Sequence, residues 1–250
     1  MTDISAVISL LLFVVSSSFY LFYWVEHQAA NFRSVVFKCL PIISLCLLVY
    51  SHQSHVDLQF QRGILWSLIL STCADGIFIK PAMWTAVLGT VLFAIAQIVS
   101  MMAFGFDPWR WDMLCVSLTA WSAFVFYAIM KARAKTSHLD IGTYIYLFIL
   151  FGMCWRVAAF CAHIANVSYV CDVLGTTGLI GALSFVLSDL IIVIHIIVVE
   201  IPDRTHWVMA TYYLAQLGLA LTVYRSDFSC LRGEVKETLV QSDNTFITSP

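Results

Sequence analysis

The stretch that decides the fold is Val173–Val199, VLGTTGLIGALSFVLSDLIIVIHIIVV, in which one aspartate and one histidine are the only ionisable side chains. A helix needs about 20 apolar residues to cross the hydrocarbon core of a bilayer, so this stretch can span a membrane. Its glycines Gly175, Gly178 and Gly181 predict a tilted helix or a close contact with another helix. The stretch therefore favours a membrane protein.

Seven more apolar stretches of similar length accompany it. The eight predicted spans are Ile4–Val25, Val35–Ser51, Gly63–Ile79, Trp84–Phe104, Asp112–Met130, Gly142–Ile164, Val173–Val199 and His206–Tyr224. The connections Lys80–Met83 and Glu200–Thr205 are hairpin-sized, so the neighbouring helices run antiparallel. We predict an all-α, polytopic membrane protein, with eight transmembrane helices over residues 1–224 and a polar, disordered tail over residues 225–250.

The composition of the whole chain agrees with this interpretation. Of its 250 residues, 61% are hydrophobic and only 11% are charged, whereas soluble domains carry about 25% charged residues. The 13 Lys and Arg residues against 15 Asp and Glu residues leave no basic face, which excludes a nucleic-acid-binding protein. We expect the protein to be surrounded by membrane lipid. A homo-oligomer is possible, because the sequence does not determine the number of chains.

Two aspartates lie inside predicted spans, where an ionisable side chain is costly and typically faces a cavity or a partner. Asp75 and Asp189 each follow a small residue, Ala74 and Ser188 respectively. Their helices run in the same direction, and both residues lie just past the middle of their spans, ~6 Å and ~4.5 Å from the midplane. We therefore expect the two carboxyl groups at one depth, in one cavity.

Two carboxyl groups in a dry cavity suit acid–base chemistry. Their mutual repulsion and the low dielectric keep one of them protonated, so that it can act as an acid, while the other stays ionised and activates water. The alternative interpretation is structural: each aspartate caps or bonds a neighbouring helix, or pairs with a basic residue.

Other polar residues leave two interpretations open. Arg156, in the middle of its span, would bind a phosphate or would hold helices together through an ion pair or backbone carbonyls. Lys38 is a phosphate ligand near the surface or a snorkelling side chain. The sequence contains no H-E-x-x-H motif, no His/Cys metal spacing and no G-x-S-x-G elbow, so we predict no metal, no cofactor and no classical serine hydrolase.

Six short segments are similar to those of a known family. They are KCLPI from Lys38, STCAD from Ser71, FAIAQ from Phe93, MCWR from Met153, GALSFVLSD from Gly181 and TYYLAQ from Thr211. On these segments the chain resembles the YhhN-like lysoplasmalogenase family of multi-pass membrane proteins, in its animal form. The resemblance runs from about Lys38 to Tyr224, and the segments that begin at Gly181 and Thr211 are its most specific parts.

The resemblance implies a function. It implies hydrolysis of the vinyl ether bond of lysoplasmalogens, a class of lysophospholipid, to a fatty aldehyde and glycerophosphoethanolamine or glycerophosphocholine, in the endoplasmic reticulum membrane. It fits Asp75 and Asp189 as the catalytic pair, with Asp189 as the acid. The residues expected to bind the substrate are Lys38, Ser71, Gln97, Arg156, Ser188, Tyr212 and Gln216.

Three other functions stay open at this point. Intramembrane Asp and Arg residues are also typical of a non-enzymatic lipid or ion transporter. A second alternative is a hydrolase that acts on ester lysophospholipids. The third is a lipid-binding family member without activity, suggested by Ala74, where many members have glycine.

Overall fold

The computed structural model describes residues 2–25, 31–51, 58–78, 82–107, 109–135, 141–164 and 169–225. Within these ranges the chain forms eight α-helices, one π-helical turn and no strand, so the predicted all-α class is confirmed. The elements are α1 (Thr2–Phe19), η1 (Tyr20–Trp24), α2 (Phe32–Ser51), α3 (Leu58–Phe78), α4 (Met83–Ala103), α5 (Trp111–Lys135), α6 (Ile141–Ile164), α7 (Tyr169–Ile197) and α8 (Arg204–Arg225). Apart from Arg225, the predicted tail lies outside the described residues.

Six of the described helical stretches are long and apolar enough to cross a membrane. They are Ile4–Trp24, Phe32–Ser51, Met83–Ala103, Trp111–Lys131, Ile141–Ala162 and Thr176–Ile197. The chain is therefore a multi-pass membrane protein. The prediction of eight spans is supported for these six, while α3 and α8 are less apolar than this measure requires.

The lower hydropathy of α3 and α8 follows from their position inside the bundle. Polar side chains on both helices are buried, among them Gln61 and Asp75 on α3 and Gln216 on α8. Such side chains are tolerated where protein groups meet them: the Gln61 amide donates a hydrogen bond of 2.7 Å to the Val49 carbonyl oxygen of α2. This polar first turn explains why α3 begins before its predicted start at Gly63.

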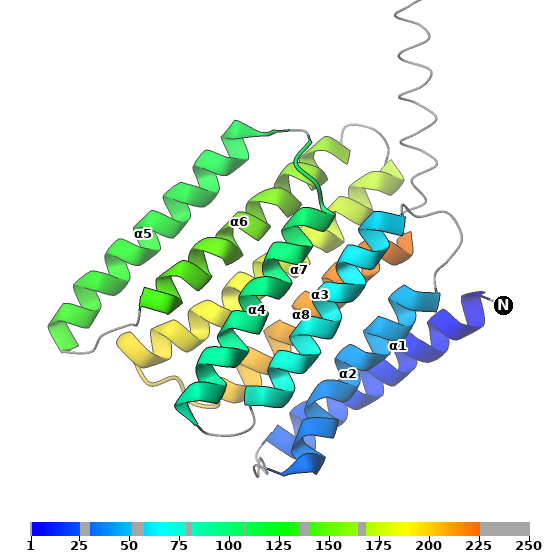
Figure 1. The fold of residues 1–250 in the computed structure, drawn as a ribbon, viewed down its shortest axis with the longest axis horizontal. Coiled ribbons are helices and arrows are strands. Elements are labelled where there is room, and N and C mark those ends of the chain that lie inside the picture. The colour runs from blue at the N-terminus through cyan, green and yellow to red at the C-terminus, as the bar shows by residue number, and fades with distance from the viewer. Residues whose placement is uncertain are drawn as a thin grey trace, which may run out of the picture.

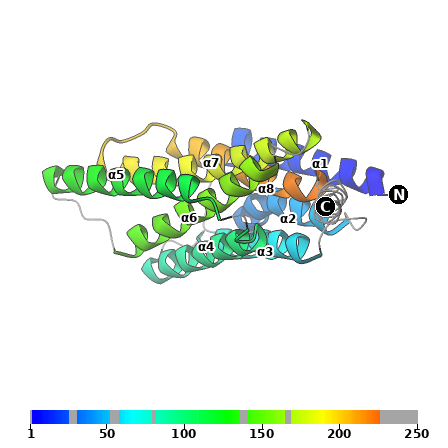
Figure 2. The ribbon, with the colours of Figure 1, turned by 90° about the horizontal axis from the view of Figure 1, so that it is seen from above.

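The helices form an elongated bundle (Figures 1 and 2). The hairpin of α3 and α4 lies on one face, with α7 and α8 behind it, while α5 and α1 lie at opposite edges (Figure 1). Helix α8 packs against α7, α2 and α3, so it connects the two halves of the bundle. This arrangement brings residues of α2, α3, α7 and α8 to the middle of the molecule.

Small residues allow α7 and α8 to approach each other closely, as the glycines of the opening stretch predict. A Cβ atom added to Gly181 would lie 3.0 Å from the Ala215 carbonyl oxygen, and one added to Gly218 would lie 2.6 Å from the Gly181 Cα atom. The surroundings of Gly175 lie outside the described side chains. The backbones of α7 and α8 are therefore in direct contact.

Replacing Gly218 with Ala is expected to lower the free energy of unfolding by about 1–3 kcal/mol, because the new methyl group meets backbone atoms that cannot move aside. The measurement is a denaturant titration of the purified protein in detergent. Gly142→Ala is the matched control, since an added Cβ on this α6 glycine has nothing within 4 Å. Equal stability of the two variants would contradict a tight α7–α8 contact.

Candidate active site

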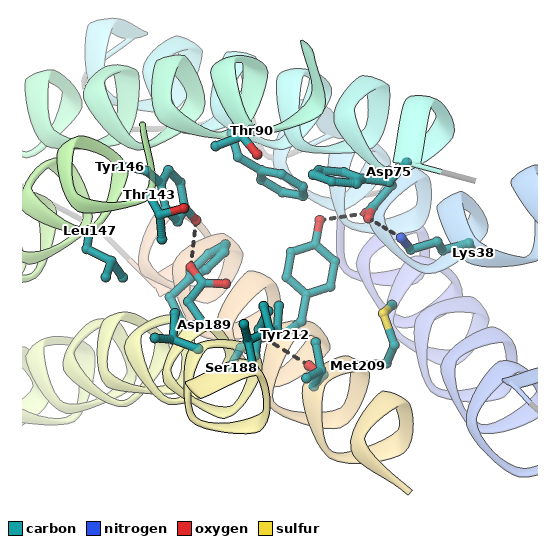
Figure 3. A pocket seen from close by; sticks show the side chains of 17 residues that line it. Lys38, Asp75, Thr90, Thr143, Tyr146, Leu147, Ser188, Asp189, Met209 and Tyr212 are labelled. Carbon is teal, nitrogen blue, oxygen red and sulfur yellow. Dashed lines mark hydrogen bonds and ion pairs between the residues drawn. The ribbon is translucent and has the colours of Figure 1, made fainter. Parts of the chain in front are cut away.

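A cavity of about 400 Å³ lies in the middle of the bundle, where residues of six helices meet (Figure 3). Its size falls within the range of small-molecule sites. The lining residues are Lys38, Asp75, Phe78, Thr90, Phe93, Thr143, Tyr146, Leu147, Phe185, Ser188, Asp189, Ile192, Val193, Ile196, Val208, Met209 and Tyr212. The walls are thus mostly apolar, with a few polar groups among them.

On one side of the cavity, Asp75 carries a complete set of partners. Its Oδ1 atom lies 2.9 Å from the Lys38 ammonium group, and its Oδ2 atom accepts a hydrogen bond of 2.6 Å from the Tyr212 hydroxyl group. The Tyr213 hydroxyl group donates to the Lys38 carbonyl oxygen at 2.9 Å and so ties α8 to α2. Since Asp75 is only 2% exposed, its negative charge is compensated inside the protein.

On the other side, Asp189 has a different environment. Its Oδ2 atom accepts a hydrogen bond of 2.6 Å from the Tyr146 hydroxyl group of α6, and its second carboxyl oxygen points away from that tyrosine (Figure 3). The ion pairs of the described residues are Lys38–Asp75 and Arg110–Asp112, and neither includes Asp189. Asp189 therefore faces the cavity without a cation beside it.

The structure brings the two aspartates to one cavity, where each bonds a different tyrosine. In Figure 3 the Tyr212 ring stands between them. A carboxyl group next to a cation favours its ionised form, whereas one in apolar surroundings without a cation favours its neutral form. The cavity thus holds one carboxyl group that is paired with a cation and one that is not.

The other residues expected to bind the substrate are found in three places. Ser188 and Tyr212 line the cavity together with Lys38, and the Ser188 hydroxyl group also donates to the Val208 carbonyl oxygen at 3.1 Å. Three more residues are buried without being part of the cavity lining. They are Ser71 on α3, Gln97 on α4 and Gln216 on α8.

Arg156 belongs to a structural contact rather than to the cavity. It is fully buried, and its Nε atom donates a hydrogen bond of 2.6 Å to the carbonyl oxygen of Gly105, a residue with φ +69° just after α4. Its guanidinium group also lies over the Phe106 and Trp155 rings, at 5.6 and 5.1 Å from their centroids. These contacts fit the carbonyl clamp, which is one of the two interpretations that the sequence leaves open for Arg156.

Tyr146 is the site residue that the sequence analysis missed. Its position in the sequence does not distinguish Tyr146 from the other aromatic residues of the same apolar span. The available signal is energetic, since a buried tyrosine hydroxyl group needs a hydrogen-bond partner and an unpaired intramembrane aspartate can supply one.

Comparisons with known proteins agree on a family. The model of the YhhN family matches residues 33–223. The chain is 26% identical over 215 residues to lysoplasmalogenase TMEM86B of Rattus norvegicus, which covers 86% of this chain and 83% of the relative. It is 27% identical over 218 residues to lysoplasmalogenase TMEM86A of Bos taurus, which covers 86% of this chain and 88% of the relative. No solved structure gives a significant match.

Replacing Lys38 with Met is expected to lower the free energy of unfolding by about 3–5 kcal/mol, because it leaves the buried Asp75 charge without its cation. The double variant Lys38→Met/Asp75→Asn removes that charge and should recover most of the loss. Denaturant titrations of the four members of this cycle measure the coupling. The exposed pair Arg110–Asp112 is the control, where Arg110→Met should change stability little. Additive effects at Lys38 and Asp75 would contradict the coupling.

Proposed function

Because this chain belongs to the YhhN family, we propose that it is a membrane-embedded hydrolase that cleaves the vinyl ether bond of lysoplasmalogens. The names of its relatives support the reaction class. The observation that carries the proposal is the pair of unlike carboxyl groups, Asp75 with Lys38 and Asp189 without a cation, on one apolar cavity. The resemblance to the family also supports the endoplasmic reticulum membrane as the location.

The first step is a proton transfer from Asp189. A vinyl ether breaks when its outer alkene carbon takes up a proton, which leaves an oxocarbenium ion at the carbon that bears the oxygen. A neutral carboxylic acid can deliver this proton, and Asp189 lies in a setting that favours the neutral form. Tyr146 holds one carboxyl oxygen and thereby orients the other toward the substrate.

The second step uses Asp75. A water molecule adds to the oxocarbenium carbon and gives a proton to the Asp75 carboxylate, whose charge also stabilises the cation. The resulting hemiacetal collapses to a fatty aldehyde and a glycerophospho-alcohol, and the proton on Asp75 returns to Asp189. In glycoside hydrolysis, too, one carboxyl group acts as the acid and a second acts as the base or the nucleophile. Proton transfer and water addition account for every step.

The walls of the cavity suit a lipid chain. Phe78, Phe93, Phe185, Ile192 and Val193 supply apolar surface for the alkenyl chain. We place the headgroup phosphate toward Lys38, because its ammonium group uses one of its three donors on Asp75 and its side chain is 16% exposed.

Replacing Asp189 with Asn removes the acid and is expected to lower aldehyde release from a synthetic lysoplasmalogen by at least about 10²-fold. The assay uses the purified full chain in nanodiscs. Asp112→Asn is the matched control, because Asp112 is a carboxylate of a membrane helix that is not part of the cavity lining. Full activity of the Asp189 variant would overturn the proposed acid.

The same assay separates the alternative functions. An ester lysophospholipid of equal chain length, offered beside the vinyl ether, distinguishes an ester hydrolase from a lysoplasmalogenase. Uptake of the lipid into liposomes without release of aldehyde would favour a transporter.

Replacing Tyr146 with Phe is expected to reduce kcat roughly tenfold with KM unchanged, because it removes the hydrogen bond that orients Asp189. Tyr144→Phe is the control on the same helix, since Tyr144 is not part of the cavity lining. Kinetics of both variants with the same lysoplasmalogen provide the comparison. A rise in KM alone, or equal losses in the two variants, would contradict this positioning role.

A further inference from the structure

Next to the cavity lies a layer of three buried polar side chains. It consists of Ser71 on α3, Gln97 on α4 and Gln216 on α8, which are 1%, 1% and 0% exposed. We call these three residues the polar layer. None of them belongs to the cavity lining, and the catalytic steps above do not use them.

The packing of α3 and α4 places Ser71 opposite Gln97. The Ser100 hydroxyl group donates to Ser67 Oγ at 2.7 Å and fixes the register of this antiparallel pair. One turn along, toward the end of α3 and the start of α4, come Ser71 and Gln97. A further turn brings Asp75 and Phe93, both of which line the cavity. Ser71 and Gln97 therefore lie one turn away from the cavity.

Helix α8 places Gln216 at the same level. Tyr212 bonds Asp75, and α8 runs antiparallel to α3 because helix directions alternate along the bundle. Gln216, one turn after Tyr212, therefore faces the level of Ser71, one turn before Asp75. Its amide adjoins the Tyr212 hydroxyl group.

The polar layer needs a ligand. Among the described residues, no hydrogen-bond partner meets Ser71 Oγ, Gln97 Oε1 or either polar atom of the Gln216 amide. An unpaired polar atom in a membrane interior is costly, so three such side chains at one level indicate a bound molecule.

The chemistry of these atoms selects water as that molecule. Gln97 Oε1 and Gln216 Oε1 need a donor, while Gln216 Nε2 needs an acceptor. A metal cation cannot accept a hydrogen bond, an anion without a proton of its own cannot donate one, and the layer contains no ionised side chain to balance either charge. Water does both and binds typically through two to four polar partners.

We propose that Ser71, Gln97 and Gln216 form a water-binding site beside the cavity, and that this site supplies the hydrolytic water to Asp75. The supply step rests on the proposed function, whereas the binding of water does not. A lipid chain in the cavity covers its apolar side, so a separate polar approach lets water reach the oxocarbenium carbon. One water leaves the layer in each turnover: its oxygen bonds to that carbon and one of its protons passes to Asp75.

Stability distinguishes a hydrated layer from a dry one. In a dry layer, Gln216→Leu and Gln97→Leu remove unpaired polar atoms and raise the Tm of the purified protein. In a hydrated layer, the same variants expel a bound water that still has other partners, and the Tm falls. We expect a lower Tm, and a higher Tm would overturn the site.

A structure of the full chain in nanodiscs that resolves ordered water is a second test. It should show a water peak in contact with Gln216 and Ser71. Direct pairing of the Gln97 and Gln216 amides without a water peak would also overturn the site.

Activity tests the supply of water. Ser71→Ala is expected to lower kcat for the lysoplasmalogen roughly tenfold with little change in KM. Ser44→Ala is the matched control, because Ser44 is also fully buried but donates to the Pro41 carbonyl oxygen of its own helix at 2.5 Å. Unchanged kcat in Ser71→Ala would overturn the supply step. If the wild-type chain releases no aldehyde at all, the proposed function fails, and the Tm values and the water peaks still decide the site.

Discussion

A charged side chain inside a membrane needs a compensating charge from the protein, because lipid cannot solvate it. In this chain Lys38 and Asp75 form such an ion pair. The pair joins α2 to α3, and two tyrosines of α8 complete it, Tyr212 at the carboxylate and Tyr213 at the Lys38 backbone. Residues of three helices therefore meet at a single buried ion pair. The cavity forms beside this junction, where α4, α6 and α7 close the remaining sides.

The same constraint makes the two aspartates chemically different. Asp75 receives a cation and a hydroxyl donor, while Asp189 receives one tyrosine and no cation among the described residues. Helix packing thus gives two identical residues different surroundings, and the proposed mechanism assigns the base to one and the acid to the other. The proposed reaction needs this difference, because one group has to give a proton while the other accepts one.

Lipid and water meet this site from different directions in the proposed arrangement. The apolar walls contributed by α4, α6 and α7 suit the alkenyl chain, whereas the polar layer joins the cavity through Asp75 and Tyr212 on α3 and α8. Asp75 and Ser71 on α3 and Tyr212 and Gln216 on α8 are among the polar residues of the cavity and the polar layer, and these two helices are also less apolar than a typical span.

Much of this follows from the sequence. The apolar stretches determined the all-α class and the approximate helix positions, and the glycines predicted a tilt or a close helix contact, for which the structure supplies α8 as the partner. The cost of an ionisable group in lipid singled out Asp75, Asp189 and Arg156, because that cost belongs to each residue by itself. The groups that each of these residues contacts, in contrast, depend on the tertiary structure. Only the packing of one helix against another decided that Lys38 meets Asp75, that Tyr146 meets Asp189, and that Arg156 donates to the Gly105 carbonyl oxygen.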